Sequence, residues 1–133
     1  MTDIGYGFVK ELPDMPPDAA EELVTAKLKD EGFGILTRID ARATLKEKLD
    51  VDFRDYRILG ACNPPFAHKA LSAEPHIGLL LPCNAVVQED GKGGSVVSLF
   101  NPRAAFALVD KPELASVMEE VEARLKRVLA ALG

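Results

Sequence analysis

The chain has 133 residues, of which 47% are hydrophobic and 28% are charged, and its formal net charge at pH 7 is -5. This length predicts one domain over residues 1–133, and it is enough to build a hydrophobic core without a stabilising metal or disulfide. The acidic balance argues against nucleic acid as a partner.

The beginning of the chain and its apolar runs bear on where the protein works. Residues 1–18 contain acids and prolines where a secretory signal needs an apolar segment. The longest apolar run is far shorter than a membrane span, so we expect no membrane as a partner. We therefore expect a cytoplasmic protein, whose two cysteines stay reduced.

The first part of the chain predicts a strand, a helix and a second strand. Residues 4–12 have the composition of a strand that stops at Pro13. Prolines and acids then open a helix that ends at Gly32. The apolar stripe of this helix consists of Ala20, Leu23, Val24 and Leu28. Residues 35–43 alternate with a period of two and predict a half-buried strand.

Short elements fill the middle of the chain. Thr44 and Glu47 match a capping box, which predicts a helix that reaches Leu49. Residues 56–61 predict a buried strand. The next residues predict another short helix, with Asn63 as its N-cap and a proline in its first turn.

The last third predicts a hairpin and the longest helix. Residues 77–90 are strongly apolar and predict a strand, in which Pro82 implies a bulge or an edge position. Residues 95–100 predict its hairpin partner, and Asn101 begins another helix. The final helix, 111–132, carries an apolar stripe at helical spacing, which must cover a sheet.

The order of these elements predicts the α/β (α+β) class. We expect a two-layer sandwich, in which a mixed β-sheet of about five strands has helices packed mainly on one face. Such a sheet leaves its other face or an edge free for a second subunit. We therefore expect a homodimer.

Several pieces between residues 31 and 87 occur in a characteristic order and spacing. They are "GFG", "TLKEKL", "YRILGACNP", "KAL", "LLLPCN" and the "VV" that follows. In these pieces the chain resembles the prokaryotic family catalogued as domain of unknown function 302. The resemblance implies a compact α/β domain that is often a homodimer, with the two Cys-Asn segments at motif positions. It implies no established reaction.

An asparagine follows each of the two cysteines, at Cys62–Asn63 and at Cys83–Asn84. If the two apolar strands are neighbours in the sheet, both pairs approach each other and form one site. Asn63 also has a structural explanation as a helix cap. Asn84 lies in an apolar strand and must satisfy its amide at a bulge or in a pocket. Either thiol is also explained as a small buried core residue.

Cationic residues near strand ends and helix starts indicate an anionic ligand. Arg57 and Lys46 are such residues, and the helix N-terminus at Asn63 is a natural anion receptor. Solvated side chains are the alternative explanation for these cations. The hypothesis is a binding domain for a small polar or anionic ligand. The expected site residues are Cys62, Asn63, Cys83, Asn84, Arg57 and Lys46.

Two other functions stay open. Cys62 and Cys83 are candidates for a thiol-based redox site or for a transition-metal site with His68 as the third ligand. Thiolates with imidazole suit zinc or copper(I). In the remaining hypothesis the motifs only stabilise the fold and a dimer interface. The sequence identifies no cofactor and no catalytic residue.

Overall fold

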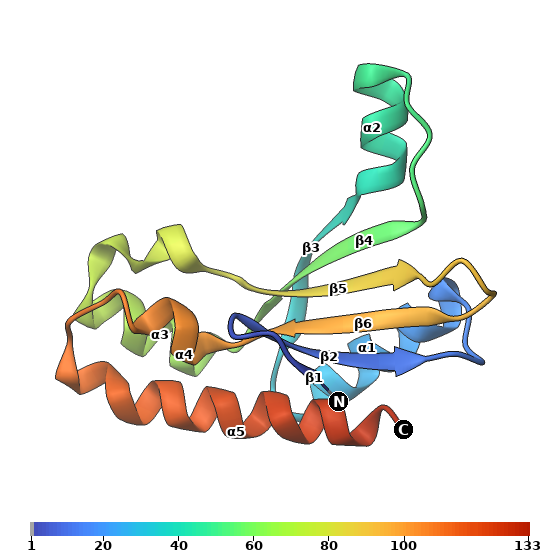
Figure 1. Cartoon of the computed structure of the whole chain (residues 1–133). Helices are drawn as coiled ribbons and strands as arrows, with labels where there is room; N and C mark the ends of the chain where they lie inside the picture. The colour runs from blue at the N-terminus through green and yellow to red at the C-terminus, as the bar shows by residue number, and fades with distance from the viewer. Residues whose placement is uncertain (1) are drawn as a thin grey trace.

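The computed structural model describes residues 2–133 and contains a six-stranded sheet in the order β1-β2-β6-β5-β4-β3 (Figure 1). All neighbouring strands pair antiparallel. The strands are β1 (Thr2–Asp3), β2 (Gly7–Leu12), β3 (Gly34–Asp40), β4 (Tyr56–Cys62), β5 (Cys83–Glu89) and β6 (Ser95–Phe100).

The predicted α/β class is confirmed, but the described sheet is antiparallel instead of mixed and has six strands instead of about five. Neighbouring parallel strands need a connection that crosses over the sheet, and no neighbouring pair here is parallel. The sixth strand is β1, which lies before the expected strand over 4–12, and that strand begins only at Gly7. Gly5 has a φ of +89°, and its N–H donates to Asp3 Oδ1 at 2.7 Å, so the chain turns between β1 and β2.

Two long helices, α1 (Pro17–Asp30) and α5 (Ala115–Ala131), lie together on one side of the sheet (Figure 1). Shorter helices connect the strands. They are α2 (Ala41–Leu49), α3 (Pro64–Ala73), α4 (Pro102–Phe106) and the 3-10 helices η1 (Pro75–Leu80) and η2 (Pro112–Leu114). Over residues 2–133, none of these helices combines the length and the apolar character that crossing a membrane requires.

The main core lies between the long helices and the sheet. Alternate residues of the central strands face this layer, as the period of a strand requires. The predicted stripe of α1 is buried there at Ala20, Val24 and Leu28, and Leu23 packs at its margin. The strand and α5 residues opposite them are Leu59, Ala85, Val87, Val97, Leu99, Val121, Leu125 and Leu129.

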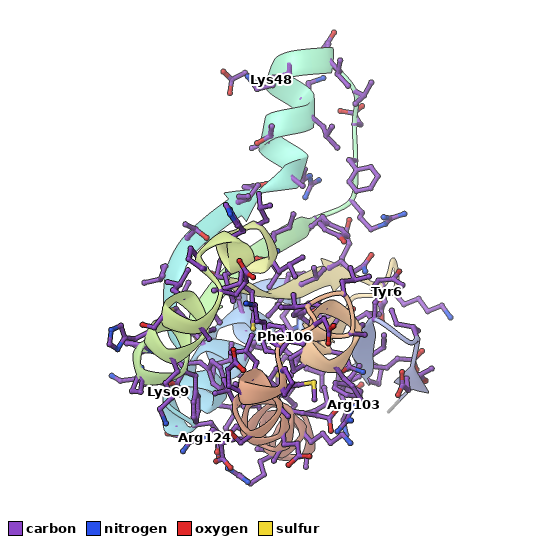
Figure 2. The ribbon with its side chains drawn as sticks, turned by 90° about the vertical axis from the view of Figure 1, so that its left-hand side faces the viewer. Tyr6, Lys48, Lys69, Arg103, Phe106 and Arg124 are labelled. Carbon is purple, nitrogen blue, oxygen red and sulfur yellow. The ribbon has the colours of Figure 1, made fainter. Side chains whose placement is uncertain are left out.

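β3 and α2 depart from the sequence prediction. The strand ends at Asp40 because that side chain accepts a hydrogen bond from Ala43 N at 2.9 Å and caps α2. The helix therefore begins before Thr44, and the predicted capping box is wrong. β3 is an edge strand with only Ile35 partly buried, so the expected half-buried face is wrong too. α2 buries no residue and projects from the sheet as an arm, with Lys48 near its tip (Figure 2).

The segment before β5 also differs from its prediction. Residues Pro75–Leu80 form η1 instead of a strand, because Pro75 opens the helix and Glu74 caps the N–H of His76 at 3.1 Å. β5 begins at Cys83, directly after Pro82. Pro82 therefore ends the irregular segment instead of making a bulge inside a strand or lying in an edge strand.

Candidate functional site

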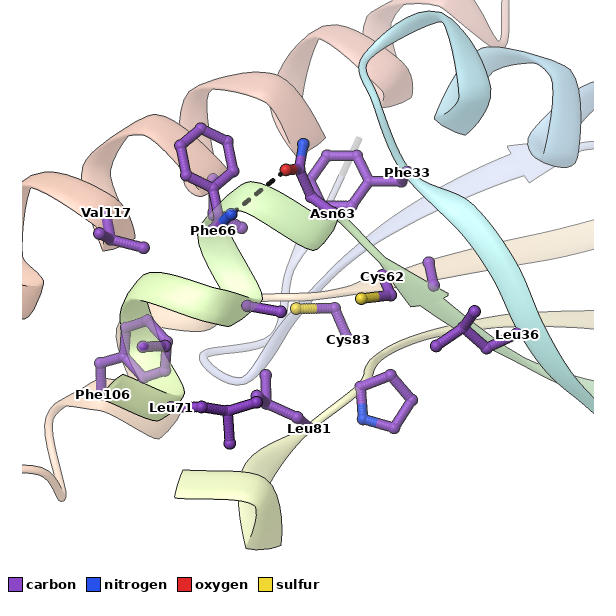
Figure 3. A pocket seen from close by; sticks show the side chains of 15 residues that line it. Phe33, Leu36, Cys62, Asn63, Phe66, Leu71, Leu81, Cys83, Phe106 and Val117 are labelled. Atoms are coloured by element: carbon purple, nitrogen blue, oxygen red, sulfur yellow. Dashed lines mark hydrogen bonds between the residues drawn. The ribbon is translucent and has the colours of Figure 1, made fainter. Parts of the chain in front are cut away.

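An apolar cavity of about 280 Å³ lies where β4 and β5 meet α3 and α5. We call it the cysteine cavity, because both cysteines lie in its wall (Figure 3). The other lining residues are Phe33, Leu36, Ala61, Asn63, Phe66, Ala67, Ala70, Leu71, Leu81, Pro82, Phe106, Val117 and Val121. Apart from Asn63 and the two thiols, every lining side chain is a hydrocarbon.

Strand pairing brings the two cysteines into one wall. Ala61 of β4 is the direct partner of Cys83 in β5, and Cys62 is the next residue along β4. Both cysteines are free and half-buried, and both sulfur atoms point into the cavity (Figure 3). Burial raises the pKa of the Cys83 thiol to about 11, and the charge of a Cys62 thiolate adds to this rise in pKa.

Asn63 lies in the same wall and caps a helix. It is the N-cap of α3, and its Oδ1 accepts a hydrogen bond from Phe66 N at 3.4 Å. The side chain is buried, and its Nδ2 lies 2.8 Å from the point where a Cβ on Gly32 would stand. Asn63 therefore fixes the start of α3 against the end of α1.

Asn84 does not belong to the cysteine cavity. It is exposed and faces a separate hollow that it shares with Tyr6, Leu79 and Phe100. The register explains the difference, because Asn84 pairs with Gly60 and points to the opposite face of the sheet from Cys83. The two Cys-Asn pairs are thus alike in sequence and different in environment.

Arg57 belongs to an ion-pair network at the opposite end of β4. Its guanidinium donates to Asp55 and Glu21 at 2.8–2.9 Å and lies 2.7 Å from Asp18. The hydrogen bond from Arg57 lowers the pKa of Asp55. The pKa of Glu21 is lowered first by Arg38 and then by Arg57. These carboxylates satisfy Arg57, so the network does not supply a cation to the cavity.

The remaining predicted residues lie on the surface. Lys46 projects from α2 and pairs with Asp50 at 2.9 Å and Asp52 at 3.4 Å. His68 is exposed on α3. Within residues 2–133, no group of three or more His, Cys, Asp or Glu side chains is placed to hold a metal ion. His68 therefore does not complete a three-ligand set with the cysteines.

Aromatic residues that the sequence analysis did not select form much of the cavity wall. Phe33, Phe66 and Phe106 are three of the six phenylalanines in the chain. The guanidinium of Arg124 lies 5.1 Å from the Phe66 ring centre, and Arg124 also donates to the backbone oxygen of Glu31 at 3.0 Å. This contact holds Phe66 in place from α5. In the sequence these residues are distinguished only by being apolar, and two of them, Phe33 and Phe66, lie within or next to the motif pieces.

The profile of one protein family, described as Domain of unknown function DUF302, matches residues 8–132. The chain belongs to the DUF302 family. The match runs from β2 to the end of α5. Every element that lines the cysteine cavity therefore lies within the family's domain, and the predicted family is confirmed.

A solved member of the DUF302 family has a similar fold. It is a crystal structure of an uncharacterized conserved DUF302 protein from Bacillus stearothermophilus, with a TM-score of 0.86 and 26% sequence identity. The match covers 96% of this chain and 98% of that chain. None of the curated proteins matches the chain. The comparisons establish the family and the fold, and the proposal of a function depends on the cavity.

Proposed function

We propose that this DUF302 domain binds a small, uncharged, apolar ligand in the cysteine cavity. The observation that carries the proposal is the apolar lining of a cavity of about 280 Å³. The cavity opens to solvent beside Leu36 and Leu71, which are exposed. A ligand with complementary surface would remove this apolar lining from water, which is favourable.

The volume and the lining define the ligand class. An apolar cavity of 150 Å³ binds benzene, so about 280 Å³ has room for roughly ten non-hydrogen atoms. Three phenylalanine rings in the wall favour an aromatic ligand, because ring pairs add attraction beyond their buried area. The ligand is therefore a small aromatic or short aliphatic molecule.

This ligand class differs from the polar or anionic ligand expected from the sequence. No cationic side chain lines the cavity, so a free anionic ligand would lack an ion-pair partner there. The two cations expected nearby, Arg57 and Lys46, pair with carboxylates elsewhere. The one buried amide of the cavity, Asn63, already uses its oxygen in the helix cap.

Thermal unfolding with toluene tests the proposal, and benzoate serves as an anionic comparator with the same ring. Toluene at ten times its dissociation constant should stabilise the wild type by about 1.4 kcal/mol, or roughly 5 °C. Ala67→Leu, which fills the cavity from α3, should abolish the shift. Ser72→Leu, on the exposed side of α3, should retain it. An equal shift with benzoate, or a full shift in Ala67→Leu, would refute the proposal.

We also propose that two copies of the chain associate through the arm, which comprises α2 and residues 50–55. Leu49, Val51 and Phe53 are exposed on the arm, and Leu49 is 66% exposed. A nine-residue helix without packing is only marginally stable in water, so a covering partner supports its formation. A second copy that packs on these apolar side chains gives a closed two-fold interface.

Light scattering after gel filtration measures this association. The wild type should elute with the mass of two chains, and Leu49→Glu should elute with the mass of one. Leu108→Glu is the matched control, because Leu108 is 81% exposed and lies outside the arm. The arm is excluded as the interface if Leu49→Glu stays dimeric or if the wild type is a monomer at high concentration.

A further inference from the structure

The only two cysteines of the chain are neighbours in the wall of an apolar cavity. We propose that Cys62 and Cys83 bind one copper(I) ion through their two sulfur atoms, without a third protein ligand. This inference is independent of the apolar-ligand proposal, although both use the same cavity.

The sheet geometry places the two thiols within reach of one ion. Direct partners in an antiparallel pair have Cα atoms about 5 Å apart, and Ala61 is such a partner of Cys83. Cys62 follows one residue later, so the Cα atoms of Cys62 and Cys83 are roughly 6 Å apart. Figure 3 shows that both side chains turn the same way, into the cavity. A metal–sulfur bond is about 2.3 Å long, so the proposal requires the two sulfurs to lie roughly 4.6 Å apart around the ion.

The ligand set selects the metal. Structural zinc sites need four protein ligands, and catalytic zinc sites need three. The cavity wall offers two thiols and no histidine or carboxylate, and His68 is exposed on α3. Calcium and magnesium need several oxygen ligands, but the only side-chain oxygen in the wall, Asn63 Oδ1, is engaged in the helix cap. Copper(I) is soft, prefers thiolates and accepts two of them in a linear arrangement.

The surroundings suit a copper(I) bis-thiolate complex. Its net charge is -1, and Cys62 lies immediately before the N-terminus of the ten-residue helix α3, where the helix dipole favours negative charge. Ala61, Leu81 and Pro82 surround the sulfurs with hydrocarbon. This apolar wall offers the metal no hard oxygen ligand that would favour the divalent state.

An anaerobic titration of the reduced, full-length chain with copper(I), in competition with a chromophoric copper(I) chelator, tests the site. We expect one copper(I) per chain. Cys62→Ser and Cys83→Ser should each weaken binding at least a hundredfold while circular dichroism stays unchanged. Zinc(II) in excess should not displace the copper. Ser72→Cys, which adds a thiol on the exposed face of α3, should leave the stoichiometry of tight binding at one.

X-ray absorption of the copper-loaded wild type provides a readout that does not depend on how the variants fold. We expect two sulfur neighbours and no nitrogen or oxygen neighbour at bonding distance. Copper(I) affinity retained in either serine variant, equally tight zinc(II) binding, or a nitrogen ligand in the absorption spectrum would each overturn the inference. These outcomes leave the toluene test unaffected, since that test varies Ala67 and not the thiols.

Discussion

Ala61 and Cys83 are direct partners where β4 ends and β5 begins. This pairing explains how Cys62 and Cys83, which α3 and η1 separate in sequence, reach one cavity. β4 ends where Asn63 caps α3, and β5 begins where η1 ends after Pro82. The cavity therefore forms beside the end of β4 and the start of β5, where both strands adjoin α3 and α5.

Gly60 determines how closely Pro82 packs against β4. A Cβ at Gly60 would collide with Thr37 Oγ1 and would lie 2.8 Å from Pro82 Cγ. Gly60→Ala should therefore displace the cavity wall and lower the free energy of unfolding by about 1–3 kcal/mol. Gly34→Ala is the control in the adjacent strand, because nothing lies within 4 Å of its Cβ position. Urea unfolding of both variants measures the difference, and equal values would contradict this role of Gly60.

Gly32 combines an unusual backbone angle with a close approach to the helix cap. Its φ is +87°, and a Cβ there would lie 2.8 Å from Asn63 Nδ2. Gly91→Ala isolates the backbone cost, because φ is +79° and nothing is within 4 Å. We expect Gly32→Ala to be more destabilising than Gly91→Ala by about 1 kcal/mol, the usual value of an N-cap. In an Asn63→Ala background this excess should disappear, and its persistence would assign it to another contact.

Most of the fold was predictable because its elements have strong local signals. The stripe of α1, the hairpin from β5 to β6 and the N-cap at Asn63 all follow from spacing or capping chemistry. The boundary at Asp40 was not predictable, because alternation of apolar residues continues past it while the Asp40 side chain starts a helix. The η1 segment was missed for a similar reason, since its leucines have the composition of a strand.

The site was only partly predictable, because its members come together through tertiary packing. The register of β4 and β5 brings Cys62 near Cys83. The sequence suggested this proximity, because both cysteines lie at the ends of apolar strands. Phe33, Phe106 and Val121 reach the same cavity from distant parts of the chain. Arg57 has the charge expected of an anion site, but the acids that satisfy it lie partly on α1, which sequence spacing does not reveal.

Arg57 should make the stability of the protein sensitive to acid. Its partners Asp55 and Glu21 have lowered pKa values. Such groups stabilise the fold above their unfolded pKa, and this contribution is lost as the pH falls through the folded pKa. Stability should therefore decline below about pH 4–5, near the ordinary pKa values of these carboxyls. Arg57→Met should reduce that decline without abolishing it, because Arg38 still lowers the pKa of Glu21.

Arg103→Met is a matched control for the loss of stability caused by Arg57→Met. At pH 7, Arg57→Met should lower the free energy of unfolding by about 2–3 kcal/mol, since a largely buried ion pair loses its cation. Arg103→Met removes a pair with Glu122 in which Arg103 is 55% exposed, and it should cost clearly less because solvent screens an exposed pair. Denaturant unfolding from pH 3 to pH 7 measures both variants, and an unchanged acid profile in Arg57→Met would contradict the assignment.

Cys83 should react slowly with alkylating agents while the protein is folded. Its pKa is raised to about 11, mainly by burial and secondarily by Cys62. In a Cys62→Ser variant burial still acts, and Cys83 is the only thiol. At pH 8 iodoacetamide should modify the folded variant far more slowly than the same variant in urea, where burial no longer raises the pKa of the thiol. Mass spectrometry of quenched samples gives the rates, and the folded-state rate should still be rising with pH where the rate in urea has levelled off. A folded-state rate that levels off at the same pH as the rate in urea would show that burial does not raise the pKa of Cys83.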